Sequence, residues 1–174
     1  TELSNALLRS DDIGLPEDVM ITAAGGASEV VHLATFMVGQ DLQVVALFDS
    51  DEAGRREEEK LRTKWLTRYK SNRSATVFVG EASGSSQRDF AIEDLFPEDY
   101  YLGKLRESHG PKLKAIGKSQ ADLNFSGQGL LVSRSEKGCE AAGIQFNKGS
   151  VAKLIRRDLI KLSNTKELPT GTAE

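Results

Sequence analysis

Apolar positions along the chain form short continuous runs in some places and stripes with helical spacing in others. The run Val44–Phe48 is too short for a typical helix and contains β-branched valines, so it predicts a strand buried on both faces. Further strands are predicted at 19–22 and 75–79, with a Gly/Ser-rich loop over 80–87. Strands that alternate with helices indicate an α/β fold with a mostly parallel sheet.

Helical spacing predicts five helices within residues 28–162. Ser28 is expected to cap the first and Gly39 to end it. The second begins near Glu52, with a charged outer face over 55–60. The others are expected to start at Pro97, to span 136–142 before Gly143, and to run from 149 or 150 to 162. Inward positions are Leu61, Trp65, Leu66 and Tyr69 in the second helix, Tyr101, Leu102 and Leu105 in the third, and Val151, Leu154, Ile155, Leu159 and Ile160 in the last.

Segments outside these helices have weaker patterns. Residues 1–9 have helical character, and 13–16 form a connector. Residues after Gly110 are expected to be irregular and basic, and those after Ser163 to be frayed.

Composition is that of an ordinary globular protein of 174 residues with a net charge of −3. The chain has no apolar run long enough to span a membrane, so we expect a cytoplasmic protein that does not enter membranes. Cys139 is the single cysteine, which excludes an internal disulfide and a thiolate zinc site. Residues 1–100 carry a net −9 and residues 101–174 a net +6. This asymmetry suits a cation site beside a surface for a polyanion, although ordinary patchiness is an equal alternative.

Two aspartates follow the run at 44–48 directly. Because strand side chains alternate, Asp49 and Asp51 are expected to share one face, with Ser50 turned away. Carboxylates at the carboxyl end of a strand lie where α/β sheets bind ligands, and two close ones favour a hard divalent cation. The alternative is that one aspartate caps the following helix while the other is solvated.

Three further groups are candidates for chemistry. The acidic pair Glu93-Asp94 suits a second cation of a phosphodiester-cleaving site, or else a helix N-terminus. Lys148, just ahead of the last helix, suits a phosphate or is simply solvated. The Gly25-Gly26 turn allows close backbone approach to a phosphate, although a purely conformational role fits equally. His32 and His109, the second in a predicted turn, are poor candidates.

Several motifs together resemble the Toprim domain of OLD-family (overcoming lysogenisation defect) nucleases over most of residues 15–160. DSDEAGR at 49–55, after a buried strand, is typical of Toprim domains in general. The segments Ile92-Glu93-Asp94-Leu95-Phe96 and Phe146-Asn147-Lys148, with the turn at 24–28, indicate the OLD branch.

The resemblance implies a Toprim-like, mostly parallel sheet flanked by helices, with an additional C-terminal helical portion. It divides the chain into a catalytic core at 1–108, a basic segment with helices at 109–162 and a flexible tail at 163–174. It implies DNA cleavage with two Mg²⁺ or Mn²⁺ ions in a bacterial-type cytoplasm. Asp49 and Asp51 would be metal ligands, Glu93 with Asp94 would hold the second metal, Lys148 would steady the scissile phosphate, and Glu52 would assist.

The chain departs from this family in one respect. Toprim domains open with a strand that ends in glutamate, and the chain begins too late to contain it, since Glu2 lies on a predicted helix. A C-terminal fragment, inactive alone, is therefore expected. The family carries an N-terminal ABC-type ATPase domain, through which ATP would act, and a homo-oligomer would form through the absent region. The competing hypotheses are a haloacid-dehalogenase-like phosphatase with Asp49 as nucleophile, and a non-catalytic Toprim scaffold.

Overall fold

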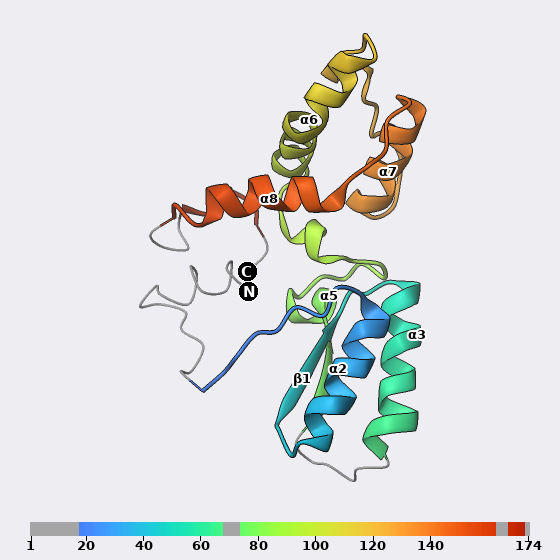
Figure 1. The fold of residues 1–174 in the computed structure, drawn as a ribbon, viewed down its shortest axis with the longest axis vertical. Coiled ribbons are helices and arrows are strands. Elements are labelled where there is room, and N and C mark those ends of the chain that lie inside the picture. The colour runs from blue at the N-terminus through green and yellow to red at the C-terminus, as the bar shows by residue number, and fades with distance from the viewer. Residues whose placement is uncertain (1–17, 68–73, 163–166, 173–174) are drawn as a thin grey trace. The chain divides into compact units, whose positions relative to one another are not determined.

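A computed structural model describes residues 18–67, 74–162 and 167–172. The chain divides into two compact units. Unit 2 comprises residues 23–92 and contains both strands (Figure 1). The described part of unit 1 comprises 18–22 together with the helical residues from Glu93 onward. The predicted mixed α/β class is confirmed, since a small parallel sheet is combined with helices.

Unit 2 is built on two parallel strands in register. β1 (Val44–Phe48) pairs with β2 (Ser74–Phe78), and Val44 lies opposite Ser74. A parallel pair needs a crossover connection, which begins with α3 (Glu52–Lys60) and continues as a π-helical segment over Leu61–Leu66. The carboxyl ends of both strands therefore lie at the same edge of the sheet.

One face of the sheet packs against helices. Ala46 and Phe48 are buried against Val31 and Ala34 of α2 (Ala27–Gly39) and against Leu61. On the opposite face Val45 is 69% exposed and Leu47 is 49% exposed. The prediction that β1 is buried on both faces is therefore wrong for the described residues. Every residue of this run is apolar, so the sequence does not reveal that successive side chains are alternately buried and exposed.

Other expectations for this region are partly wrong. Residues 19–22 form no strand, and Met20 is 79% exposed. The N-cap of α2 is Gly26, and Ser28 lies inside the helix, where its hydroxyl donates to Glu29. The predicted end of α2 at Gly39 is confirmed. The positive φ of Gly25, +100°, gives the preceding turn a conformation that glycine adopts most readily.

The charged face predicted for α3 is not uniformly solvated. Glu57 and Glu58 are buried. Glu57 pairs with Lys60 at 2.6 Å, and Glu58 accepts a hydrogen bond from Thr76 of β2 at 2.7 Å. The prediction that Leu61, Trp65 and Leu66 face inward is confirmed; Tyr69 and the segments 1–9 and 13–16 lie outside the described residues.

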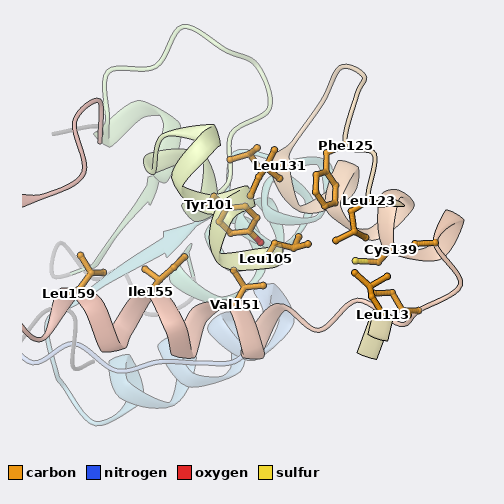
Figure 2. Packing of buried hydrophobic residues seen from close by; sticks show 13 residues of the cluster. Tyr101, Leu105, Leu113, Leu123, Phe125, Leu131, Cys139, Val151, Ile155 and Leu159 are labelled. Atoms are coloured by element: carbon orange, nitrogen blue, oxygen red, sulfur yellow. The ribbon is translucent and has the colours of Figure 1, made fainter. Parts of the chain in front are cut away.

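Unit 1 is a helical assembly around an apolar core. Its helices are α6 (Glu98–Ala115), α7 (Leu131–Ala141) and α8 (Lys148–Leu159), with short 3₁₀ turns at Ile92–Leu95, which spans the boundary with unit 2, and at Gln120–Asp122. Figure 2 shows the inward side chains of α8 facing those of α6. Fully or nearly fully buried residues of this core include Tyr101, Leu105, Leu113, Cys139 and Val151.

The length of α6 overturns one prediction. Residues after Gly110 are not irregular, because α6 continues through Pro111 to Ala115. Pro111 provides no backbone N–H, but Leu113 in the next turn is fully buried in the core. Burial of this side chain explains why the helix extends beyond a residue that usually ends one.

Helix boundaries elsewhere differ more modestly. α7 starts at Leu131 rather than 136, and Gly143 follows it with φ of +78°, as expected for a residue after a helix end. α8 begins at Lys148 with Asn147 as N-cap. Ile160, predicted to face inward, is 52% exposed. Within the described residues, no helix combines the length and apolar character needed to cross a membrane.

Candidate functional site

The main chain of Ser50 fixes the carboxyl end of β1. The Ser50 N–H donates to the Phe90 carbonyl at 2.7 Å, and the Phe90 N–H donates back to the Ser50 carbonyl at 3.0 Å. The buried Ser50 hydroxyl accepts the Gly80 N–H at 2.9 Å. Since the Ser50 hydroxyl is directed at Gly80, two residues after β2, strand alternation places the flanking Asp49 and Asp51 side chains on the other side.

Asp51 is the N-cap of α3. Its Oδ1 accepts the Gly54 N–H at 2.7 Å while its backbone is extended. The helix cap that was the alternative role for one of the two aspartates is therefore present. The Asp51 side chain satisfies an amide that the first helical turn leaves without a partner. The cap and a metal role are compatible, since an ionised carboxylate offers about four acceptor positions on two oxygens.

Asp49 is held by a residue distant in sequence. Its Oδ1 accepts the backbone N–H of Ile92 at 2.9 Å. Asp49 and Asp51 are both half-buried. Each aspartate is therefore oriented through one oxygen by a main-chain donor within unit 2.

Gly54 allows α3 to approach the strand end. A Cβ atom at this position would lie 2.0 Å from the Asp49 carbonyl oxygen and 3.3 Å from Asp51 Oδ1. No side chain fits this gap without displacement of the main chain. The glycine of the DSDEAGR motif therefore has a steric reason to lie three residues after Asp51.

Arg55 joins the strand end to the loop that follows β2. Its guanidinium donates to the Ser50 and Arg88 carbonyls at 3.1 and 3.0 Å and pairs with Asp89 at 2.6 Å. An open pocket of about 170 Å³ lies beside it, and its lining includes Ser50, Arg55, Gly80, Glu81 and Arg88. The Asp89 carboxylate balances the Arg55 charge and Glu81 also lines the pocket, so Arg88 is the lining cation without an ion pair among the residues that the structure describes. Glu52, the first residue of α3, is exposed.

The chemistry of this edge fits a hard cation. Asp49 and Asp51 offer oxygen ligands, and Mg²⁺ is commonly held by one or two carboxylates together with waters. Among residues 18–67, 74–162 and 167–172, no group of three or more His, Cys, Asp or Glu side chains is arranged to hold a metal ion.

Unit 1 holds the other predicted residues. Lys148 Nζ pairs with Glu93 Oε1 at 2.7 Å, which brings together two residues 55 positions apart. The Glu93 side chain is 10% exposed and that of Lys148 is 49% exposed. A buried carboxylate thus holds the ammonium of a lysine whose side chain still reaches solvent.

Asp94 has a structural partner. Its Oδ1 accepts the N–H of Leu131, the first residue of α7, at 3.1 Å. Burial, with the nearby charges of Glu93 and Asp94, raises the pKa of the Tyr101 hydroxyl well above its usual value. Tyr101 therefore stays neutral beneath the acidic pair at physiological pH.

Sequence reasoning missed three residues that organise these groups. Arg55 is the last residue of the DSDEAGR motif, and the sequence alone predicts no role for it. His109, placed in a turn, lies within α6 and is fully buried. Asn147 belongs to the segment Phe146-Asn147-Lys148, and the structure shows that it caps α8. Its position directly before a predicted helix was a usable signal, since asparagine is a preferred N-cap.

Comparison of the chain with protein-family models, curated proteins and solved structures found no match.

Proposed function

We propose that this chain is the metal-dependent DNA nuclease domain of a larger protein, with a Toprim-type catalytic site resembling that of OLD-family nucleases. The observation that carries the proposal is the strand end of unit 2, where Asp49 and Asp51 flank the inward-facing Ser50 and are each oriented by a main-chain N–H. A preorganised pair of carboxylates at this edge is what a divalent cation needs.

Asp49 and Asp51 would hold the cation. When bound, Mg²⁺ or Mn²⁺ would withdraw charge from the phosphodiester oxygens and lower the pKa of an attacking water. Asp51 keeps the N-terminus of α3 in place while it does so. Arg55 orients the Ser50 carbonyl, and Arg88 beside the pocket would bring positive charge to the nucleic-acid backbone.

Lys148 would bind a phosphate oxygen of the DNA. Its ammonium is half-exposed, and it occupies the first position of α8, where helix N–H groups also favour an anion. Glu93 pairs with this ammonium and would hold the second ion together with Asp94, which also accepts the first N–H of α7. Glu52 assists from the first turn of α3.

The wider assignments rest on the resemblance. DNA is the substrate, ATP acts through an ABC-type ATPase domain of the same protein, and further copies of the chain associate through that region. The protein works in the cytoplasm. These proposals predict that cleavage by the full-length protein depends on Mg²⁺ or Mn²⁺ and responds to ATP.

Plasmid nicking by the full-length protein tests the proposal. Asp49→Asn should lower the nicking rate by about 10²-fold or more, because a preorganised charge at the reacting phosphate is lost. Asp41→Asn, a matched change at an exposed position of the same unit, should leave the rate unchanged; asparagine tolerates the φ of +61° there. Nicking retained by Asp49→Asn would refute the proposal.

Two measurements identify the competing functions. Trapping of Asp49 by fluoroberyllate, with no nicking, would indicate a phosphatase. Calorimetric titration with Mn²⁺ addresses the scaffold: no Mn²⁺ binding to the full-length protein would identify a non-catalytic domain. Asp51→Asn should weaken Mn²⁺ binding and preserve the helix cap, whereas Asp51→Ala should lose both.

A further inference from the structure

His109 occupies the centre of the contact between α6 and the start of α8. The side chain is fully buried within α6. Its ring stacks on Phe146, with centroids 5.8 Å apart and planes inclined by 14°. Phe146 lies two residues before Lys148, so the imidazole packs on the segment that leads into α8.

The hydrogen bonds of His109 define its tautomer. The Asn147 backbone N–H donates to Nε2 at 3.0 Å, so Nε2 carries a lone pair. The proton of the neutral ring is then on Nδ1, 3.2 Å from the Leu105 carbonyl and 2.7 Å from the Ser108 hydroxyl. A ring proton on Nε2 would oppose the Asn147 N–H, so only this one neutral tautomer fits the network.

The residue that His109 holds is the N-cap of α8. Asn147 Oδ1 accepts the Ser150 N–H at 2.9 Å, and Lys148 is the first helical residue. Lys112, one turn along α6 from His109, also donates to the Gln145 carbonyl at 3.3 Å. Two side chains of α6 therefore anchor the main chain immediately before Lys148.

Lys148 depends on this anchor for its direction. Its Nζ reaches Glu93 at 2.7 Å, and both ends of that pair belong to unit 1. A lysine side chain has many rotamers, so its main-chain origin and its partner must both be fixed to hold the ammonium in one place. The His109–Asn147 bond fixes the main chain from which the lysine starts, and Glu93 is the partner that holds its ammonium.

We propose that His109 is the positioning residue for Lys148: its Nε2 atom fixes the Asn147 amide, which sets the start of α8 and the reach of the lysine ammonium. This inference rests on the proposed function of Lys148 as the phosphate-binding group. A buried histidine that only filled space would need no hydrogen-bond acceptor at Nε2. A positioning histidine needs one, because Nε2 is the atom that holds the Asn147 amide.

Two substitutions separate these roles. His109→Gln keeps an oxygen acceptor near the position of Nε2, whereas His109→Leu has similar bulk and no acceptor. In the full-length protein, His109→Leu should lower nicking by about 10- to 100-fold, as loss of a residue that orients a functional group does. His109→Gln should recover most of the activity. The loss should appear more in KM than in kcat if Lys148 holds the DNA in the ground state.

A double-mutant cycle provides the sharper test. In a Lys148→Met background, His109→Leu should cause no further loss, because the group that it positions has been removed. Losses that multiply would overturn the proposal, and so would a His109→Leu variant as active as the unmodified protein. Melting temperatures of all variants show whether a loss of activity is a loss of folding.

NMR provides a readout that does not depend on DNA cleavage. In the unmodified protein, the ¹⁵N shifts of the His109 ring should show an unprotonated Nε2, and a protonated Nε2 would overturn the inference even if every variant fails to fold. The Lys148 ammonium signal should lose its pairing with Glu93 in His109→Leu and keep it in His109→Gln. Unchanged pairing in His109→Leu overturns the positioning role, whereas failure of the nuclease proposal alone leaves this NMR result intact.

Discussion

The two acidic pairs of this protein are held in place by different kinds of contact. In unit 2, Asp51 bonds to an amide three residues away, and Asp49 bonds to an amide 43 residues away that lies in the same unit. In unit 1, Asp94 bonds to an amide 37 residues away and Glu93 to a lysine 55 residues away. The first pair is built around a strand end and a helix start, and the second depends on how α6, α7 and α8 pack.

This difference predicts what each pair can tolerate. Aspartates placed by main-chain donors next to a glycine should be sensitive to local steric changes and insensitive to the helical core. Glu93 and Asp94 should respond to any change that loosens that core. The predictions below test this contrast with substitutions outside the acidic residues and within them.

The largest effect is expected from Leu105→Ala. Leu105 is fully buried between α6 and α8, and loss of such a side chain costs about 2–5 kcal/mol. Hydrogen exchange should show the loss in the amides of α6 and α8, with little change in β1. Ile160→Ala, at an exposed position that follows α8, should cost under about 0.5 kcal/mol. Equal loss of protection in β1 would contradict the separate support of the two pairs.

Gly54→Ala should have the next largest effect. The new Cβ would lie 2.0 Å from the Asp49 carbonyl, and overpacking of this kind costs about 1–3 kcal/mol. Mn²⁺ affinity should fall too, because the strand end must shift. Gly103→Ala is the matched control: this glycine is inside α6 with open space around it, so alanine should stabilise the helix by about 0.5–1 kcal/mol. Stability unchanged by Gly54→Ala would show that the close approach is not needed.

A smaller effect is expected when Asp94 is changed. Asp94→Ala removes the acceptor for the first N–H of α7 and should cost about 1 kcal/mol, as for other lost caps. Asp94→Asn keeps Oδ1 and should cost less. Urea unfolding measures both. If Asp94→Asn lowers DNA cleavage more than Asp94→Ala does, although it is the more stable variant, the carboxylate charge serves the second ion as well as α7.

The sequence was most informative where the contacts are local. The run at 44–48, the break at Gly39 and the acidic start of α3 follow from patterns over a few residues, and all three are confirmed. The exposed face of β1 did not follow, because a run of apolar residues is the same whether one or both faces are covered. The extent of α6 did not follow either, since the burial of Leu113 outweighs a proline.

The candidate site shows the same division. The position of the aspartates and the cap formed by Asp51 could be predicted from local spacing. The Asp49–Ile92, Asp94–Leu131 and His109–Asn147 bonds could not, because they join residues that only the folded chain brings together. The charge difference between residues 1–100 and 101–174 does not follow the division into two units. Of the net −9 of residues 1–100, residues 1–22 and 93–100 carry −4 each and residues 23–92 carry only −1, so this negative charge lies mostly outside unit 2. Charge counted by halves is therefore a poor guide to the units.

The smallest expected effect is a pH dependence specific to unit 1. Burial lowers the pKa of His109, with a contribution from the nearby Lys112 charge, while the bond to the Leu105 carbonyl opposes this shift. The unfolded chain then binds a proton at pH values where the folded protein keeps the ring neutral. Stability should be fully present above about pH 6.5, the ordinary pKa of histidine, and decline as pH falls from there through the lower pKa of the folded state.

Urea unfolding between pH 7.5 and 5 measures this decline. His109→Gln should abolish it, whereas His32→Gln should retain it, because His32 is exposed and is the one other histidine of the sequence. The carboxylates of Glu98 and Glu107, whose pKa values are lowered by hydrogen bonds from Arg134 and Arg157, add their own loss only below about 4.5. A decline above pH 5 that survives in His109→Gln would mean that a group other than His109 causes it, and the pH dependence would then give no support to a neutral imidazole at the Asn147 amide.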